Sequence, residues 1–308
     1  MFKRNFAQIL LTLTVFFSAF SASAQQNALP FTDFKKIVPL KEAAAAPLQV
    51  LLEDEIMSNP KWKRLIDNKK MSIGVVDLNN VYEANYAGIN STEMMYAASL
   101  PKIAILLASM DAIEKCELEE TEAVKKDLKA MINRSDNQAS TRMIDRLGYK
   151  KIADVLQSPA YKLYDKTEGG GLWVGKRYAA SGARNPDPLK GLSHAATVKQ
   201  VCRFYYKMVT GNLVSQDKSR QMLDIMEDSN IHHKFVNTLD RIAPDARVFR
   251  KSGSWKNYHA DSVLVWGKDG RKYILVALIE DASGEQIIRD LVEPIEKVIK
   301  KSRSLETT

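Results

Sequence analysis

Runs of apolar residues lie toward the two ends of the chain and predict the strands of a sheet. The first two runs are joined by Asp77-Leu78-Asn79-Asn80, whose composition is typical of a tight turn and predicts a hairpin. The last two are joined by Lys268-Asp269-Gly270, a second hairpin signal. The predicted strands are 71–76, 81–86, 247–253, 261–266 and 272–280.

Between these ends, apolar residues recur at helical spacing. The predicted helices are one that begins near Leu48 and those over 103–113, 121–132, 139–147, 150–157, 195–210, 215–227 and 285–300. This order predicts an α/β fold of the α+β kind: an antiparallel sheet built from both chain ends and covered by helices, plus a helical subdomain. We expect a site in the cleft between the two parts.

The same pattern predicts the domain organisation. We expect a sheet-containing part over 47–96 and 223–308, and a mainly helical part over 97–222. Inside the helical part, Gly169–Gly171 and Asn185–Pro188 bracket a loop-rich stretch, and we place the active-site loop at about 164–192. A loop of this length is typical of a functional segment. We interpret residues 25–46 as a linker.

Residues 1–24 have the features of a secretory signal peptide: Lys3 and Arg4, a short apolar run, and Ala22-Ser23-Ala24 as the cleavage signal. We expect a periplasmic or secreted protein without stable membrane insertion after cleavage; an uncleaved N-terminal anchor is the alternative. Loss of Lys3 and Arg4, with no acid in that segment, lowers the formal net charge from +8 to +6. No stripe of basic residues with interleaved aromatics is present, so nucleic acid is not an expected partner.

Two cysteines and four histidines leave little material for a disulfide scaffold or a metal site. Cys116 and Cys202 either pair in an oxidising compartment or remain separate thiols. The histidines lack a helical His-x-x-x-His spacing, and we expect no metal and no cofactor. They are His194, His232, His233 and His259.

Ser-x-x-Lys occurs three times, beginning at Ser58, Ser99 and Ser215. Only Ser99 follows strand-like segments and precedes an apolar helix, with Pro101 in the first turn, where its missing N–H costs nothing. Three residues apart on such a turn, Ser99 and Lys102 lie on one face. An uncharged Lys102 could remove the Ser99 proton and create a nucleophile. The alternative is a capping serine followed by a solvated lysine.

Two further segments contain polar residues that suit a site. Ser135-Asp136-Asn137 lies between two predicted helices, where the alternative is a simple N-cap. Lys251-Ser252-Gly253 lies at the end of a predicted strand, where the alternative is a solvated lysine before a turn.

Taken in order, Ser99-x-x-Lys102, Ser135-Asp136-Asn137 and Lys251-Ser252-Gly253 resemble the signature of the penicillin-recognising serine enzymes, the class A β-lactamases and penicillin-binding proteins. The resemblance covers roughly residues 48–300. It implies a β-lactamase/transpeptidase-like fold, and the segment from Gly191 to Leu213 also resembles the class A segment that follows the active-site loop.

The resemblance implies roles in proton transfer. Ser99 is the expected acylated nucleophile, and Lys102 its base or part of a proton relay. Ser135 is expected to pass the proton to the leaving nitrogen.

The resemblance also implies roles in substrate binding. Asn137 is expected to bind the substrate amide, while Lys251 attracts the substrate carboxylate and the Ser252 hydroxyl contacts it, within the segment that Gly253 closes. The backbone N–H groups of Ser99 and Ser254 are the expected oxyanion hole, whose donors are often the largest catalytic contribution.

The sequence departs from the class A pattern in two ways. Ser99 and Ser135 are only 36 residues apart, which predicts a reduced helical part and a more open cleft. The Glu-x-x-Leu-Asn segment, whose glutamate activates the hydrolytic water in class A enzymes, is missing, and no acid occurs between Gly169 and Pro186. Glu168 is the candidate replacement, with Asp187 as another.

The aromatic residues of this loop leave two alternatives. Tyr164, Trp173 and Tyr178 either line an altered pocket or only pack the loop.

We therefore expect an exported serine hydrolase of the β-lactamase family that opens β-lactam or related amide and ester bonds through an acyl-Ser99 intermediate. The first alternative is a penicillin-binding-type D,D-peptidase or slow acyl-trapping protein, because the loop glutamate is missing. The second is a non-catalytic binding domain of the cell envelope. The expected partner is a small-molecule β-lactam or a peptidoglycan-like substrate, and the expected state is a monomer.

Overall fold

The computed structural model describes residues 38–42, 47–227, 229–268 and 270–306, so the predicted signal peptide and most of the predicted linker lie outside the described residues. The described chain forms a central sheet whose strand order is β1-β3-β2-β11-β10-β9. All neighbours pair antiparallel except β1, which is parallel to β3. The strands are β1 (Lys41–Glu42), β2 (Met71–Asp77), β3 (Asn85–Ile89), β9 (Arg247–Trp255), β10 (Tyr258–Trp266) and β11 (Lys272–Glu280).

The prediction of an antiparallel sheet built from both chain ends is confirmed. β2, from the N-terminal part, pairs with β11, from the C-terminal part, in a register that places Gly74 opposite Val276. Both faces of this pair are buried: Leu275 and Ala277 belong to one apolar cluster, and Ile274 and Val276 to the other. Strands buried on both faces have continuous runs of apolar residues, so the sequence pattern predicts them well.

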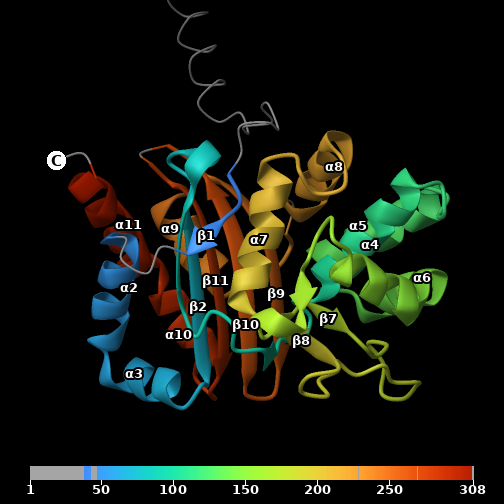
Figure 1. Cartoon of the computed structure of the whole chain (residues 1–308), viewed down its shortest axis with the longest axis horizontal. Helices are drawn as coiled ribbons and strands as arrows, with labels where there is room; N and C mark the ends of the chain where they lie inside the picture. The colour runs from blue at the N-terminus through green and yellow to red at the C-terminus, as the bar shows by residue number, and fades with distance from the viewer. Residues whose placement is uncertain (1–37, 43–46, 228, 269, 307–308) are drawn as a thin grey trace, which may run out of the picture.

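Helices cover both faces of the sheet (Figure 1). One apolar cluster joins the sheet to helices from the two chain ends, and the other joins it to α7 and to the helical part. The helices of the first group are α2 (Pro47–Met57), α3 (Pro60–Asp67), α9 (Phe235–Ile242), α10 (Gly284–Asp290) and α11 (Val292–Glu306). Those of the second are α4 (Lys102–Glu114), α5 (Glu122–Asn133), α6 (Asn137–Gln157), α7 (Val198–Val209) and α8 (Gln216–Glu227). None of the helices in the described ranges is long and apolar enough to cross a membrane.

Several predicted boundaries are wrong in detail. The predicted strand 81–86 is a short 3-10 helix, η2 (Val81–Glu83), followed by β3, because the Asn80 side chain accepts a hydrogen bond from Tyr82 N (3.2 Å) and starts the turn. The predicted helix 195–210 begins only at Val198, after the cap formed by Thr197. The limit placed between residues 222 and 223 falls inside α8. By contrast, the two helices predicted on either side of residue 148 are confirmed as halves of α6, which is kinked at Gly148 (φ 77°, ψ 152°).

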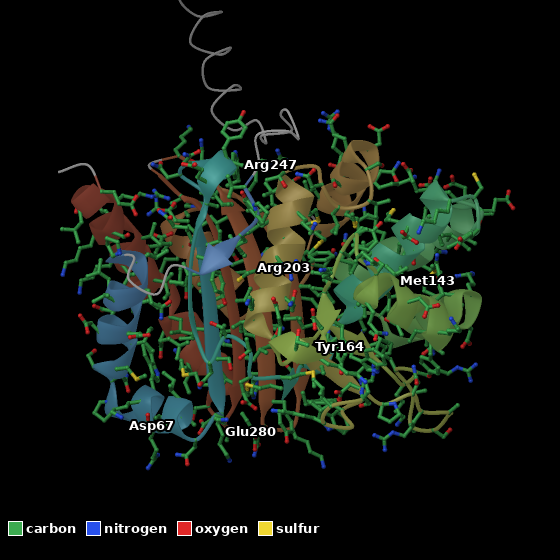
Figure 2. All side chains as sticks on the ribbon, in the orientation of Figure 1. Asp67, Met143, Tyr164, Arg203, Arg247 and Glu280 are labelled. Atoms are coloured by element: carbon green, nitrogen blue, oxygen red, sulfur yellow. The ribbon has the colours of Figure 1, made fainter. Side chains whose placement is uncertain are left out.

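The predicted loop at 164–192 contains short ordered pieces. These are β5 (Tyr164–Asp165), η3 (Lys166–Glu168), β6 (Gly170–Gly171) and β7 (Trp173–Val174). β7 pairs with β8 (His194–Ala196), which pairs in turn with β4 (Met95–Tyr96), the strand that leads to Ser99. Arg203 on α7 donates to the carbonyl of Lys162 (3.0 Å), two residues before Tyr164; both Arg203 and Tyr164 are labelled in Figure 2. The loop is therefore fixed to the strand that precedes the Ser-x-x-Lys turn.

The two cysteines are separate thiols, which contradicts the pairing alternative. Cys116 is exposed, and Cys202 is buried on α7, where its Sγ packs against Gly74 of β2.

Candidate active site

Ser99 lies in the turn between β4 and α4, half-buried at the edge of a cavity. Lys102 N donates to Ser99 O (3.2 Å), so Ser99 precedes the first residue of α4 by one turn. Ala98 has φ 50°, a left-handed conformation that turns the chain sharply just before Ser99. The predicted context of Ser99, at the start of an apolar helix, is confirmed.

Strand β9 passes directly beside this turn. A Cβ placed on Gly253 would lie 2.3 Å from Ala97 O and 2.6 Å from Ser99 N. Only glycine permits so close an approach of two backbones. The Lys251-Ser252-Gly253 segment therefore lies against the Ser99 turn, and Ser99 and Ser254 both line the same cavity.

Lys102 is completely buried at the start of α4. Its Nζ donates to Ser135 O (2.6 Å), to Asn137 Oδ1 (2.8 Å) and to Ser135 Oγ (3.3 Å). The predicted contact with Ser99 is not among these hydrogen bonds. Burial lowers the pKa of Lys102 to about 7, and the charge of Asp136 opposes this shift.

Ser135 lies in a tight turn between α5 and α6, and Asn137 is the first residue of α6. Ser135 has φ 54°, and the N-cap of α6 is Asp136, whose carboxylate accepts a hydrogen bond from Ala139 N (2.7 Å). Asp136 performs the capping role that was the alternative for this segment, and it leaves the side chains of Ser135 and Asn137 to contact Lys102.

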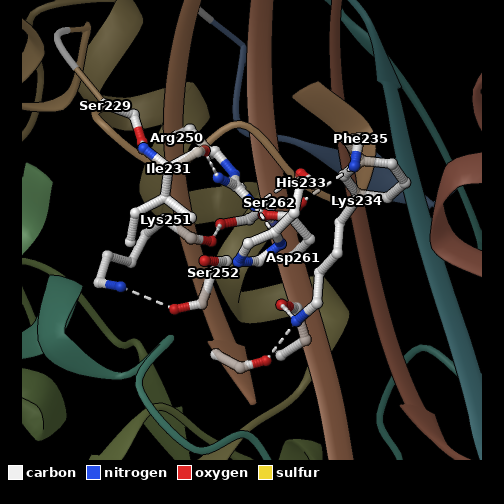
Figure 3. A network of polar contacts seen from close by, with 12 residues as sticks. Ser229, Ile231, His233, Lys234, Phe235, Arg250, Lys251, Ser252, Asp261 and Ser262 are labelled. Atoms are coloured by element: carbon white, nitrogen blue, oxygen red, sulfur yellow. Dashed lines mark hydrogen bonds and ion pairs between the residues drawn. The ribbon is translucent and has the colours of Figure 1, made fainter. Parts of the chain in front are cut away.

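Lys251 reaches the same serine from the sheet. Its Nζ donates to Ser252 O (2.7 Å), as Figure 3 shows, and to Ser135 Oγ (3.0 Å). Its side chain is buried. Burial, reinforced by the charge of Lys102, holds the pKa of Lys251 well below its usual range. The alternative of a solvated lysine is thus wrong, and Ser135 Oγ lies between two buried amines.

A second buried network supports β9 from behind (Figure 3). Arg250 forms an ion pair with Asp261 on β10 (2.9 Å) and donates to His233 O (3.0 Å). The buried Lys234, with φ 57°, donates to Gly253 O (2.6 Å), Ser254 Oγ (2.8 Å) and Ala260 O (3.0 Å). Burial lowers the pKa of Lys234 to about 8.

Sequence reasoning missed these residues. Lys234 lies in a polar segment and has no motif, and Arg250 was assigned only to a strand. The one available signal was the charge of Arg250 and Asp261 inside otherwise apolar strand patterns, because buried charges are almost always paired.

The other two Ser-x-x-Lys segments are not brought to this place. Lys61 forms an ion pair with Asp281 (3.2 Å), and Lys218 forms one with Glu120 (3.1 Å). These are ordinary partners for a lysine, whereas the hydrogen bonds of Lys102 go to neutral oxygens.

A cavity of about 850 Å³ opens beside Ser99. Its wall includes several aromatic rings, and none of the described residues that line it is a carboxylate. The aromatic residues are Tyr96, Tyr178, His194, Trp255 and Tyr258. A slightly larger hollow of about 970 Å³ lies beside α11, among residues such as Arg271, Glu293 and Lys300, and contains none of the predicted site residues.

Neither candidate for a water-activating carboxylate lies at this cavity. Glu168 is directed toward α7, where Gln200 Nε2 donates to it (3.2 Å) and Lys199 lies at 3.5 Å. Asp187 is buried and accepts hydrogen bonds from Leu192 N (2.5 Å) and Tyr164 Oη (3.2 Å), so it stabilises the loop. The structure therefore does not bring either acid to Ser99.

Tyr178 takes the position that faces Lys102. Its ring centroid lies 4.5 Å from Lys102 Nζ, and its hydroxyl donates to Ala98 O (3.3 Å). Tyr178 lines the cavity, whereas the buried Tyr164 and Trp173 pack against each other inside the loop. The pocket-lining alternative therefore holds for Tyr178, and the loop-packing alternative holds for Tyr164 and Trp173.

His194 stacks on Tyr178 (4.3 Å between ring centroids), and burial lowers its pKa to about 4, which keeps its ring uncharged at neutral pH. No group of three His, Cys, Asp or Glu side chains with the arrangement of a metal site occurs in the part of the chain that the structure describes.

Comparison with known proteins places the chain in a family. Residues 123–301 match the model of the β-lactamase enzyme family, so the chain belongs to that family, whose fold is that of a serine hydrolase. The resemblance inferred from the three motifs is therefore confirmed. No match was found among curated proteins.

Three solved structures illustrate the shared fold. A point mutant of the class A β-lactamase of the last common ancestor of Gram-negative bacteria has a TM-score of 0.61 and 13% identity, over 78% of this chain and 98% of that one. PBP-A has a TM-score of 0.61 and 18% identity, over 86% and 99%. The β-lactamase from Sphaerobacter thermophilus DSM 20745 has a TM-score of 0.60 and 16% identity, over 81% and 95%. These likenesses establish the fold and extend equally to a β-lactamase and to PBP-A.

Proposed function

We propose that this protein is an exported, penicillin-binding-type serine acyltransferase: β-lactams and related peptidoglycan-like amides acylate Ser99, and the acyl group leaves slowly. The observation that carries the proposal is a cavity lined by Ser99 and by Asn137, whose side chain contacts the Lys102–Ser135–Lys251 cluster, with no carboxylate in its wall among the described residues. Acylation needs the serine and the nearby amines. Rapid hydrolysis of the acyl ester needs a base that activates water, and a wall without a carboxylate does not supply one.

Acylation begins with the Ser99 proton. Because burial lowers the pKa of Lys102 to about 7, an uncharged amine is accessible near neutral pH. That amine accepts the proton from Ser99 Oγ as the oxygen attacks the substrate carbonyl carbon. Apo geometry is often looser than that of the reacting complex, so the hydrogen bonds of Lys102 to the Ser135 turn do not exclude this transfer.

The tetrahedral intermediate then collapses. The backbone N–H groups of Ser99 and Ser254 stabilise its oxyanion, a contribution of about 3–4 kcal/mol for each donor. The C–N bond breaks, and the leaving nitrogen takes a proton from Ser135 Oγ, which lies between Lys102 and Lys251. Lys102 returns its proton to Ser135, and the acyl group remains on Ser99.

Hydrolysis requires activation of a water beside the acyl ester. Glu168 faces α7, Asp187 forms hydrogen bonds within the loop, and the ring of Tyr178, which lines the cavity, lies 4.5 Å from Lys102 Nζ. The acyl-enzyme therefore persists. This favours the acyl-trapping alternative over efficient β-lactam hydrolysis, and the signal-peptide pattern of residues 1–24 supports an envelope location.

Nitrocefin separates the candidate functions. The proposal predicts a burst of about one nitrocefin opened per protein molecule, followed by turnover at least about tenfold slower than the burst. Steady turnover without a burst would instead indicate a β-lactamase, and no reaction, together with unchanged ligand binding by Ser99→Ala, would indicate a non-catalytic binding domain.

A further inference from the structure

Three cations lie along one wall of the Ser99 cavity. Lys176, Arg177 and Arg184 belong to the loop, and Lys176 pairs with Arg184 through a backbone bridge. In the part of the chain that the structure describes, the cavity wall contains no acid that would neutralise them.

The charges of these three residues are not equally compensated. Arg177 forms an ion pair with Asp145 (2.6 Å). Lys176 Nζ donates only to a neutral oxygen, Ala180 O (3.1 Å), and Arg184 is exposed. Among the described residues, no carboxylate pairs with Lys176 or Arg184, so two positive charges remain available at the cavity.

The charges of Lys176 and Arg184 affect the pKa of a residue in the cavity wall. His194 lies in the cavity wall, and although burial is the main cause of its low pKa, the charges of Lys176 and Arg184 lower it further. Aromatic side chains line the rest of the cavity, including Trp255, which is 56% exposed. A bound group here would meet both apolar surface and positive charge.

The loop cations are separate from Lys251. Neither Lys251 nor Ser252 lines the cavity. The resemblance of their segment assigns them the ring carboxylate of a penicillin, which lies on the side of the leaving nitrogen. A substrate that satisfies both positive regions carries two anionic groups, one on each side of the bond that breaks.

We propose that Lys176 and Arg184 form a binding site for a carboxylate on the acyl side of the substrate, so that the preferred acyl donors are dianionic. This inference rests on the proposed function for the identity of the reacting bond. The binding preference itself depends only on the cavity and its charges.

Benzylpenicillin and carbenicillin are suitable probes, because carbenicillin differs by one added carboxylate on the acyl side chain. We expect the ratio of acylation rate constants, carbenicillin over benzylpenicillin, to fall about threefold to tenfold in the double variant Lys176→Gln/Arg184→Gln. The ratio for the original protein should also fall as salt is raised. The control Lys150→Gln/Lys166→Gln removes the same charge from exposed positions outside the cavity and should leave the ratio unchanged.

A second measurement does not depend on acylation. The Ser99→Ala variant is titrated with each penicillin, and binding is measured as the change in intrinsic tryptophan fluorescence, since Trp255 lines the cavity. We expect tighter binding of carbenicillin, with a preference that the added Lys176→Gln/Arg184→Gln substitutions remove. Equal affinity of the two penicillins, or a preference that survives these substitutions, would overturn the inference. Absence of any Ser99 adduct in the original protein would overturn the proposed function, while this titration would still decide the inference.

Discussion

Lys251 Nζ lies 3.0 Å from Ser135 Oγ, although the two residues are 116 positions apart in the chain. Lys102 Nζ, from the Ser-x-x-Lys motif, lies 3.3 Å from the same oxygen. Burial holds the pKa of both amines below the usual value, and the charge of Lys102 lowers the pKa of Lys251 further. The protons of the pair titrate together, and one amine is free to accept a proton near neutral pH.

The first prediction concerns pH. Lys102 can accept the Ser99 proton only when its amine is uncharged. The rate constant for acylation by benzylpenicillin should therefore rise with pH through about 7, the pKa of Lys102. Lys102→Arg keeps its proton at every accessible pH and should lose at least about 100-fold in this rate. Stopped-flow measurement of acylation from about pH 5 to about pH 9 checks both; a flat profile would argue against Lys102 as the base.

The second prediction concerns the approach of β9 to the Ser99 turn. Gly253→Ala places a Cβ 2.6 Å from Ser99 N, so it should push the strand from the turn, destabilise the fold by about 1–3 kcal/mol and reduce acylation strongly. Gly74→Ala is the matched control, because its Cβ would meet Cys202 Sγ (2.8 Å) away from the site. It should destabilise the protein but preserve acylation. Urea unfolding and adduct formation measure the two effects, and equal acylation by both variants would refute the role of Gly253.

The third prediction concerns Tyr178. Tyr178→Glu replaces the ring beside Lys102 with a carboxylate that can activate water, so the acyl-enzyme should decay at least about 10-fold faster. The new charge also stabilises protonated Lys102, so the pH profile of acylation should move upward. The control is Tyr178→Gln, because glutamine has the shape of glutamate without its charge. Decay of the penicillin adduct by mass spectrometry tests this, and an unchanged lifetime in Tyr178→Glu would contradict it.

The fourth prediction concerns the ion pair behind β9. Arg250 and Asp261 are both almost completely buried, so Asp261→Asn leaves an uncompensated charge and should destabilise the protein by about 3–5 kcal/mol. The exposed pair of Lys63 and Asp67 gives the contrast: Asp67→Asn should cost less than about 1 kcal/mol. Urea denaturation compares them. Similar losses for the two variants would mean that the buried pair does not support the strand.

The sequence predicted the parts of the molecule that depend on local pattern. Runs of apolar residues marked the strands, and the position of Ser99 before an apolar helix distinguished it from Ser58 and Ser215. The order of the three motifs then predicted that they meet, which the hydrogen bonds of Ser135 confirm.

The remaining features depend on contacts between segments far apart in the chain. Glu168 and Tyr178 are both on the loop, and only the packing of that loop against α7 and β8 decides which one faces Lys102. Lys234 has the local sequence of an exposed lysine, and its burial follows from the position of the turn that precedes α9. Neither outcome is encoded in spacing or periodicity.

The most direct test is a time course of intact mass with benzylpenicillin, followed by removal of free penicillin. We predict that one penicillin becomes attached to Ser99 within the mixing period and remains after many times that period, that Ser99→Ala forms no adduct, and that Ser58→Ala behaves as the original protein. An adduct that forms equally on Ser99→Ala, or complete hydrolysis of excess penicillin with no adduct ever detected, would contradict a persistent acyl-Ser99 enzyme.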